Sequence, residues 1–270
     1  MTITAADIRN LRDAMSISLL DNPEKQYSIS KDNYDLLVSL INVLSKDEKS
    51  IIFEFVKNYE IIKNYDRYIF DVLEKLNELH QSRVVLFPLW RIGQSSNKSG
   101  KSVLYEFSSI SRVEFPDKFQ IADDPFSSKV LNSGLPKYAV DDFVGSGEQF
   151  LGMVEEMRQK KHGVVINGVA CVISLELGAD RLCREGFDTV CSVKRKRAVA
   201  DYLVDAGMDA EKCYEVYDAM ESRLNPEPID CRGRNKSEAL VSLKRTPNNT
   251  LPVFWSVGRD KKWPAPFKRG

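Results

Sequence analysis

The N-terminal part of the chain has the hydrophobic pattern of helices. Apolar side chains recur every three or four residues, which places them on one face of a helix, in the stretches 8–19, 34–44, 51–59 and 65–79. Ser45 and Glu48 have the spacing of a capping box, in which each side chain accepts a hydrogen bond from the other residue's backbone N–H. Glycine is absent throughout. We therefore predict an all-helical segment over residues 1–82, whose apolar stripes form a core.

The pattern changes at residue 83. Short apolar runs, typical of strands buried on both faces, now alternate with helical stretches. The predicted strands are residues 84–87, 137–140, 164–166 with a possible extension to 173, and 189–193. The predicted helices are 103–110, 147–160, 175–184, 198–206 and 210–224. This alternation predicts an α/β domain over residues 83–270, with a mostly parallel sheet flanked by helices.

Two small residues mark the ends of one of these helices. Ser174 precedes the helix predicted at 175–184, and a serine at this place typically accepts a hydrogen bond from the first turn. Gly186 follows the helix, and glycine readily adopts the left-handed conformation that ends one. We predict that these residues cap its two ends.

Composition excludes some classes of protein. The 270 residues include 39 lysines and arginines and 39 aspartates and glutamates, which argues against a broadly cationic nucleic-acid-binding protein. Five cysteines without a CxxC pair and only two histidines argue against a disulfide framework or a structural zinc site. No secretory signal is visible, and Asn167 and Glu176 interrupt the most apolar stretch, so no membrane span is expected. We expect a cytoplasmic protein.

The segment that follows the strand at 137–140 carries the strongest chemical signal. It contains Asp141 and Asp142, two further residues, and then Gly145, Ser146 and Gly147 at the start of a helix. In open parallel sheets, ligands bind beyond the carboxyl ends of the strands. Backbone N–H groups of such a loop, together with the helix dipole, bind a phosphate. The carboxylates would accept hydrogen bonds from sugar hydroxyls or hold a divalent cation, so the segment predicts a ribose 5-phosphate site.

The same residues also have a purely structural interpretation. An Asp-Asp pair after a strand often forms a turn or caps a helix, and Gly-x-Gly alone is a weak motif. The ordered combination of apolar strand, acidic pair, small loop and helix is what favours function.

This ordered combination resembles the phosphoribosyl pyrophosphate loop of the type I phosphoribosyltransferases. Together with the late segment 246–255, it is most similar to the phosphoribosyltransferase-like effector domains of bacterial conflict systems. Those domains occur in anti-phage operons, including retrons, in which a reverse transcriptase and its branched single-stranded DNA restrain an effector. The resemblance covers roughly residues 83–257.

The resemblance implies roles for individual residues. Asp141 and Asp142 would bind the ribose hydroxyls, directly or through Mg²⁺, and the loop 145–147 would hold the 5-phosphate. Gln149 can also donate a hydrogen bond to the phosphate. Glu148 departs from the family pattern, and we expect it to stabilise the first turn of the helix instead.

The resemblance also places a pyrophosphate-binding loop at residues 91–101. Its candidate residues are Arg91, Lys98 and Lys101 for charge, and Ser95, Ser96, Ser99 and Gly100 for a backbone cradle. Lysines in a loop are, however, often only solvated. Trp255 either stacks on a base or fills the core.

The predicted function is that of an anti-phage effector that acts at C1′ of a ribose 5-phosphate substrate, by transfer or hydrolysis. Its expected partners are phosphoribosyl pyrophosphate or a nucleotide, the reverse transcriptase and single-stranded DNA of a retron, and a second copy of the chain. Two alternatives stay open on the same fold. One is a nucleotide sensor without catalysis, and the other is a nucleic-acid or partner-binding module that uses the basic run 194–197 and the tail 259–269.

Overall fold

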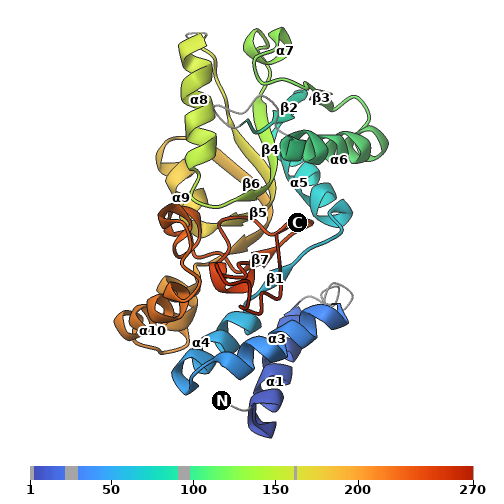
Figure 1. The fold of residues 1–270 in the computed structure, drawn as a ribbon. Helices are drawn as coiled ribbons and strands as arrows, with labels where there is room; N and C mark the ends of the chain where they lie inside the picture. Colours follow the sequence, from blue (N-terminus) through green and yellow to red (C-terminus); the bar gives the residue numbers. More distant parts are fainter. Residues whose placement is uncertain (1–2, 22–29, 91–97, 161–162, 270) are drawn as a thin grey trace. The chain divides into compact units, whose positions relative to one another are not determined.

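A computed structural model describes residues 3–21, 30–90, 98–160 and 163–269 (Figure 1). The chain packs into two compact units: residues 64–195 form one, and residues 1–63 with 196–270 form the other. We call them the sheet unit and the helical unit. This division differs from the sequence domains that we expect, 1–82 and 83–270, which remain a prediction.

The sheet unit is built on five parallel strands in the order β3-β2-β4-β5-β6 (Figure 1). The strands are β2 (Val84–Pro88), β3 (Phe119–Ile121), β4 (Lys137–Val144), β5 (Gly168–Leu175) and β6 (Asp188–Arg195). Every residue of β2 and β5 is buried, as their continuous apolar sequences predict. The predicted parallel α/β sheet is confirmed.

Helices cover both faces of this sheet. They are α5 (Asp66–Leu79), α6 (Lys98–Glu114), α7 (Ser128–Leu131), α8 (Glu148–Lys160) and α9 (Glu176–Arg184). Apolar side chains of α8 and α9, such as Phe150 and Leu182, pack with Ala139, Val169 and Cys171 of the strands. Helices α5 and α6 pack against each other and on the sheet.

Three sequence predictions need correction here. Residues 164–166 are not a strand, and Val165 is 66% exposed. Strand β5 begins only at Gly168, where a Cβ would lie 2.1 Å from the carbonyl oxygen of Asp188. Ser174 lies inside β5 and does not cap α9. Strand β4 runs on to Val144, four residues beyond its predicted end. Gly186 does end α9, with φ of 82°.

The helical unit contains the first three of the predicted N-terminal helices and the C-terminal part of the chain, whereas the fourth, predicted at 65–79, is α5 of the sheet unit. Its elements are α1 (Ala5–Asp21), α3 (Lys31–Val43), α4 (Lys46–Lys57), β1 (Glu60–Ile61), η1 (Ala198–Leu203), α10 (Ala210–Ser222), η2 (Pro228–Asp230), η3 (Arg234–Lys236), β7 (Val241–Ser242) and η4 (Pro252–Phe254). The capping box of Ser45 and Glu48 is confirmed, because each backbone N–H donates to the other side chain. Strand β1 pairs in parallel with β7, so chain segments far apart in sequence meet here.

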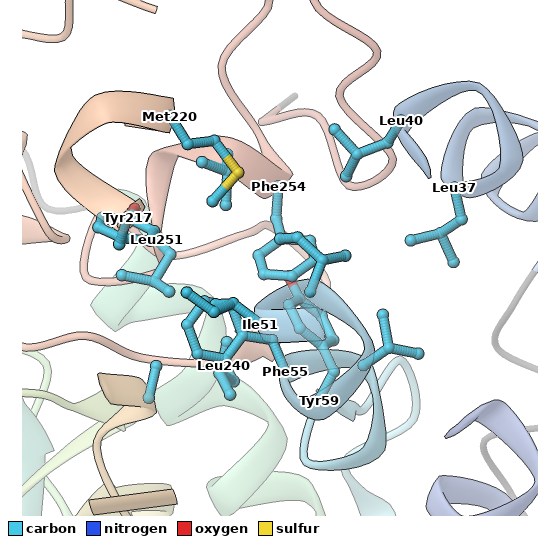
Figure 2. Close-up of a cluster of buried hydrophobic side chains, with 14 of the residues drawn as sticks. Leu37, Leu40, Ile51, Phe55, Tyr59, Tyr217, Met220, Leu240, Leu251 and Phe254 are labelled. Atoms are coloured by element: carbon cyan, nitrogen blue, oxygen red, sulfur yellow. The ribbon is translucent and has the colours of Figure 1, made fainter. Parts of the chain in front are cut away.

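The core of the helical unit is apolar and aromatic (Figure 2). Phe55 of α4 and Tyr59, two residues after that helix, contact Phe254 of η4, with ring centroids 6.4 and 4.8 Å away. The stacked ring of Phe267 lies 4.5 Å from that of Tyr59. The C-terminal segment is therefore part of this core.

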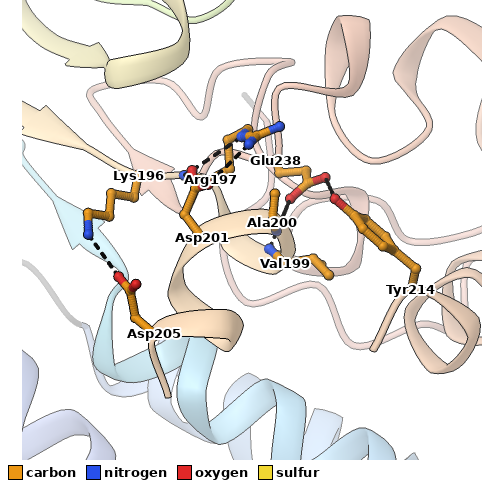
Figure 3. A network of polar contacts seen from close by, with 8 residues as sticks. All are labelled: Lys196, Arg197, Val199, Ala200, Asp201, Asp205, Tyr214 and Glu238. Carbon is orange, nitrogen blue, oxygen red and sulfur yellow. Dashed lines mark hydrogen bonds and ion pairs between the residues drawn. The ribbon is translucent and has the colours of Figure 1, made fainter. Parts of the chain in front are cut away.

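A network of hydrogen bonds around Glu238 stabilises the same unit (Figure 3). The carboxylate of Glu238, which is 2% exposed, accepts hydrogen bonds from the N–H groups of Val199 and Ala200 and from the Tyr214 hydroxyl. These two N–H groups belong to the first turn of η1, where helix donors lack partners within the helix.

Among the residues that the structure describes, no helix is both long and apolar enough to cross a membrane.

Candidate active site

The acidic pair lies within strand β4, and not after it as predicted. Asp141 pairs in register with Cys171 of β5, and pairing continues through Val144. Because successive side chains of a strand point to opposite faces, Asp141 and Asp142 leave the sheet on opposite sides. Both are half-buried. A ligand that contacts both carboxylates must therefore lie at the carboxyl edge of the sheet.

Asp142 is held by a tyrosine that sequence reasoning did not single out. The hydroxyl of Tyr65, a residue only 1% exposed, donates to Oδ2 of Asp142 at 3.2 Å. Burial raises the pKa of Asp142, the bond from Tyr65 opposes this shift, and the nearby carboxylate of Glu106 adds to it. Asp142 is thus an acid in an enclosed and partly acidic environment.

Asp141 is oriented by its neighbour's backbone. Its Oδ1 accepts the N–H of Asp142 at 3.0 Å. On the neighbouring strands, Cys171 of β5 pairs in register with Asp141, and Cys191 of β6 pairs in register with Cys171. Burial raises the pKa of Cys171, whereas a hydrogen bond with Cys171 lowers the pKa of Cys191. Asp141 is consequently followed across the sheet by two buried thiols.

The predicted phosphate loop turns its carbonyl groups toward the protein. The Gly145 oxygen lies so close to Gly178 of α9 that a Cβ there would be 2.2 Å from it. The Ser146 oxygen accepts from Nη1 of Arg181 at 3.2 Å, and the Gly147 oxygen accepts the N–H of Leu151 at 3.1 Å.

The orientation of the N–H groups follows from that of the carbonyls. In a trans peptide, the C=O of one residue and the N–H of the next point in opposite directions, and the described residues include no cis peptide. The N–H groups of Ser146 and Gly147 therefore point away from α9, and that of Glu148 points away from the body of α8. Gly147 has φ of 74°, a conformation that favours glycine. Successive N–H groups on one side of a loop, at a helix N-terminus, form an anion-binding nest.

The residues after the loop begin helix α8. Glu148, its first residue, is exposed, and a carboxylate in a first turn stabilises a helix. Gln149 is half-buried in the same turn. Their predicted roles, in helix stabilisation and in phosphate binding, remain predictions.

The predicted pyrophosphate loop lies largely outside the described residues. Arg91, Ser95 and Ser96 are outside them, and the side chains of Lys98 and Ser99 are not described either. Gly100 is buried within the first turn of α6, and Lys101 is exposed beside it. The segment therefore ends in a helix, and its role as an anion site remains a prediction.

Trp255 belongs to the helical unit. It is half-buried, its Nε1 donates to the Thr250 carbonyl at 2.7 Å, and the Arg269 guanidinium lies 5.1 Å from its ring centroid. Asn249 donates to Ser237, and Thr250 donates to the Val241 carbonyl. Hydrogen bonds within the unit thus account for much of the polar sequence 246–255, and base stacking by Trp255 remains a prediction.

The basic segments are partly neutralised or packed. Within the run 194–197, Lys196 pairs with Asp205 at 2.8 Å, and Arg197 pairs with Asp201 at 3.0 Å (Figure 3). In the tail, Phe267 is buried. These contacts reduce what the two segments offer to a nucleic acid.

The sheet unit also contains a second polar chain, at the opposite end of β4. His80 Nε2 lies 2.9 Å from the Tyr138 hydroxyl, which donates to Asp188 at 2.7 Å. Tyr138 is near the start of β4 and Asp188 begins β6, so this chain is at the amino edge of the sheet. His162 lies outside the described residues. No histidine of the described part therefore accompanies the acidic pair.

A magnesium ion fits the donor set at the acidic pair. Within the described residues, no group of three or more metal-ligating side chains occurs. Mg²⁺, however, typically takes one or two carboxylates and completes its shell with waters and substrate phosphates. Asp141 and Asp142 each supply carboxylate oxygens of this kind, from opposite faces of β4.

Comparison with solved structures returns phosphoribosyltransferases. The orotate phosphoribosyltransferase of Aeropyrum pernix is 16% identical, with 53% of this chain and 76% of that chain covered and a TM-score of 0.31. The orotate phosphoribosyltransferase of Mycobacterium tuberculosis H37Rv, in complex with 5-phospho-α-D-ribosyl 1-diphosphate, is 13% identical, with 66% and 99% covered and a TM-score of 0.31. A phosphoribosyltransferase of Corynebacterium diphtheriae is 11% identical, with 61% and 96% covered and a TM-score of 0.29. Such TM-scores transfer no residue roles.

Sequence comparison identifies the family directly. No curated protein matches the chain. The profile of the PRTase-CE family, in contrast, matches residues 30–269, which include the acidic pair, the predicted phosphate loop and helix α9. A match of this extent confirms the predicted type I phosphoribosyltransferase-like fold, and the chain belongs to the PRTase-CE family.

Proposed function

We propose that this chain is a phosphoribosyltransferase-like enzyme that acts at C1′ of phosphoribosyl pyrophosphate or of a nucleotide. The observation that carries the proposal is the loop 145–147 directly after an acidic pair: the carbonyls of Gly145 and Ser146 face α9, so the N–H groups of Ser146 and Gly147 point away from that helix. In this proposal, the loop binds the 5-phosphate, and Asp141 and Asp142 accept hydrogen bonds from the ribose hydroxyls. Both ligand groups occur together in a ribose 5-phosphate.

The proposed chemistry is substitution at C1′ by a base, another nucleophile or water. The bond from C1′ to the departing pyrophosphate or base breaks with its electron pair leaving on that group, and positive charge develops on the ribose. The half-buried carboxylates stabilise this charge, and the loop fixes the sugar in place. Mg²⁺, held by Asp141 and Asp142 together with substrate oxygens, would neutralise the departing group.

The biological setting that we propose is anti-phage defence. The support is the resemblance of the segments 140–149 and 246–255 to effector domains of bacterial conflict systems. In a retron, a reverse transcriptase and its single-stranded DNA would restrain the effector until infection. Release would then deplete a nucleotide or produce a toxic one.

Calorimetry tests the site. We expect wild-type protein to bind phosphoribosyl pyrophosphate in the presence of Mg²⁺, and the Asp141→Asn/Asp142→Asn variant to bind it on the order of a hundredfold more weakly, because two charged acceptors are lost. Asp123→Asn is the matched control, since Asp123 is an exposed aspartate of the same unit. The absence of binding by wild-type protein to phosphoribosyl pyrophosphate and to nucleotides, with and without Mg²⁺, would contradict the proposal.

Metabolite profiling tests the reaction. Cells that express wild-type protein should show a change in one nucleotide or base that cells with Asp141→Ala/Asp142→Ala lack. Binding in the calorimeter without any such change, and without turnover of purified protein, would favour a nucleotide sensor over an enzyme. The same cultures, challenged with phage, test the proposed defence role.

A further inference from the structure

One face of helix α9 contacts the phosphate loop residue by residue. A Cβ on Gly178 would meet the Gly145 oxygen, Arg181 donates to the Ser146 oxygen, and Leu182 lies 3.1 Å from where a Cβ on Gly147 would be. Positions 178, 181 and 182 are spaced by three and four residues, and thus share one face of the helix. One face of helix α9 therefore contacts all three successive residues of the loop 145–147.

We propose that Arg181 is a positioning residue for phosphate binding, and that α9 is the template that shapes the loop. This inference rests on the proposed function, since it assigns the ligand of the loop as the phosphate group of a ribose 5-phosphate. Arg181 acts through the peptide that it binds, while the loop N–H groups contact the phosphate.

Arg181 fixes the orientation of one loop peptide. Arg181 holds the Ser146 carbonyl toward α9, and the planar trans peptide then directs the Gly147 N–H to the opposite side. Gly147, with φ of 74°, belongs to a class of residue that adopts many backbone conformations, so this peptide needs an external restraint. The guanidinium supplies that restraint from a fixed helix.

Arg181 also acts electrostatically on the peptide that it binds. A hydrogen bond to a peptide carbonyl polarises the peptide and makes its N–H a stronger donor, and the effect grows when the donor is charged. Arg181 is half-buried, so water screens its charge only in part. Its positive charge lies behind the peptide whose N–H would face a phosphate dianion.

Helix α9 provides its own control. Arg184 is exposed, three residues further along, and its Nε donates to the Asp180 carbonyl of the same helix at 3.3 Å. Replacing either arginine removes one positive charge from α9, but only Arg181 contacts the loop. The comparison separates the loop contact from a general effect of charge.

The experiment compares wild type, Arg181→Gln, Arg181→Lys and Arg184→Gln. Calorimetry with ribose 5-phosphate and with phosphoribosyl pyrophosphate measures affinity, and hydrogen exchange without ligand measures protection of the amides at 146–148. We expect Arg181→Gln to weaken binding of both ligands about tenfold and to speed this exchange, with an unchanged melting temperature. Arg181→Lys should recover most of the affinity, and Arg184→Gln should match wild type.

Two failures are distinguishable. If wild type binds both ligands and Arg181→Gln binds them equally well, the inference is wrong while the proposed function stands. If wild type binds neither ligand, the proposed function is wrong, and the phosphate assigned to this loop falls with it. Equal losses in Arg181→Gln and Arg184→Gln would also overturn the inference, because they would show an effect of helix charge alone.

Discussion

Each unit of this protein contains a tyrosine hydroxyl that donates to a carboxylate, and the two pairs differ in their surroundings. In the helical unit, Tyr214 binds Glu238 at 2.6 Å, and two backbone N–H groups bind the same carboxylate. In the sheet unit, Tyr65 binds Asp142 at 3.2 Å, next to Asp141 and near Glu106. One carboxylate is surrounded by donors, and the other lies among acids.

The difference is consistent with a structural role for Glu238 and with the ligand-binding role that we propose for Asp142. Donors around Glu238 compensate the cost of burying its charge, and the group fixes the start of η1. Burial raises the pKa of Asp142 and the nearby carboxylate of Glu106 adds to the shift, while hydrogen bonds with Tyr65 and Asp141 oppose it. Such an arrangement is reasonable where a ligand supplies the missing donors, as ribose hydroxyls or a cation would.

The largest effect expected is on the stability of the helical unit. Glu238→Ala removes the acceptor of Val199 N–H, Ala200 N–H and the Tyr214 hydroxyl, and should lower the free energy of unfolding by about 3 kcal/mol. Urea unfolding followed by circular dichroism measures it. The control is Glu215→Ala, an exposed position on α10. If Glu238→Ala lowered the free energy of unfolding no more than the control does, the polar network would not stabilise the unit.

The second-largest effect expected is a loss of ligand affinity when α9 no longer fits the loop 145–147. Gly178→Ala places a Cβ 2.2 Å from the Gly145 oxygen, so the loop must move. Affinity for ribose 5-phosphate should fall on the order of a hundredfold. Gly186→Ala at the end of the same helix is the control, since nothing lies within 4 Å of its Cβ, although its φ of 82° makes a modest loss of stability expected. Unchanged affinity in Gly178→Ala would contradict a loop held by α9.

Exchanging the two tyrosines for phenylalanine tests the comparison itself. Tyr65→Phe should weaken binding of phosphoribosyl pyrophosphate about tenfold and change stability little, because it frees Asp142 at the site. Tyr214→Phe should lower the free energy of unfolding by about 1.5 kcal/mol, because its hydroxyl supports Glu238. Calorimetry and urea unfolding on both variants measure the two effects. If both variants lost ligand affinity and stability to the same extent, the two tyrosine–carboxylate pairs would not differ in role.

The smallest effect is a pH dependence at the amino edge of the sheet. Burial lowers the pKa of His80 from its usual value of 6.5, the nearby Asp188 opposes the shift, and Lys118 adds to it. The unfolded chain thus binds the proton first as pH falls, so His80 contributes stability above pH 6.5 that is lost below it. Melting temperatures of wild type should decline between pH 7 and pH 5 more steeply than those of His80→Gln. Parallel curves would show that His80 does not titrate differently on folding.

Much of the candidate site was predictable from sequence because it is local. Asp141, Asp142 and the loop 145–147 lie within seven residues of one another, and backbone preferences place such a sequence between a strand and a helix. Tyr65, Gly178 and Arg181 were not predictable in the same way. They reach the site from other elements, and nothing in their own neighbourhoods distinguishes them from core or surface residues.

The ends of strands and the pairing between them were likewise not predictable from local sequence. The strand predicted at 164–166 begins only at Gly168, where pairing with Asp188 of β6 starts and where the backbone of β6 leaves no room for a side chain. The pairing of β1 with β7 joins residues 60–61 to 241–242, and neither two-residue strand has a periodicity of its own. Strand ends and pairings depend on which other strand lies alongside in the folded protein. The residues that decide this are spread over the whole chain.

The sequence by itself determined the helical N-terminal stretch, the parallel α/β class and the acidic pair before a small loop, because hydrophobic periodicity and turn chemistry are properties of neighbouring residues. The tertiary structure alone decided which way the loop carbonyls face, which tyrosine donates to Asp142 and which arginine donates to the loop 145–147. Those outcomes depend on hydrogen bonds and close packing between elements that are distant in sequence, and such contacts exist only once the chain has folded.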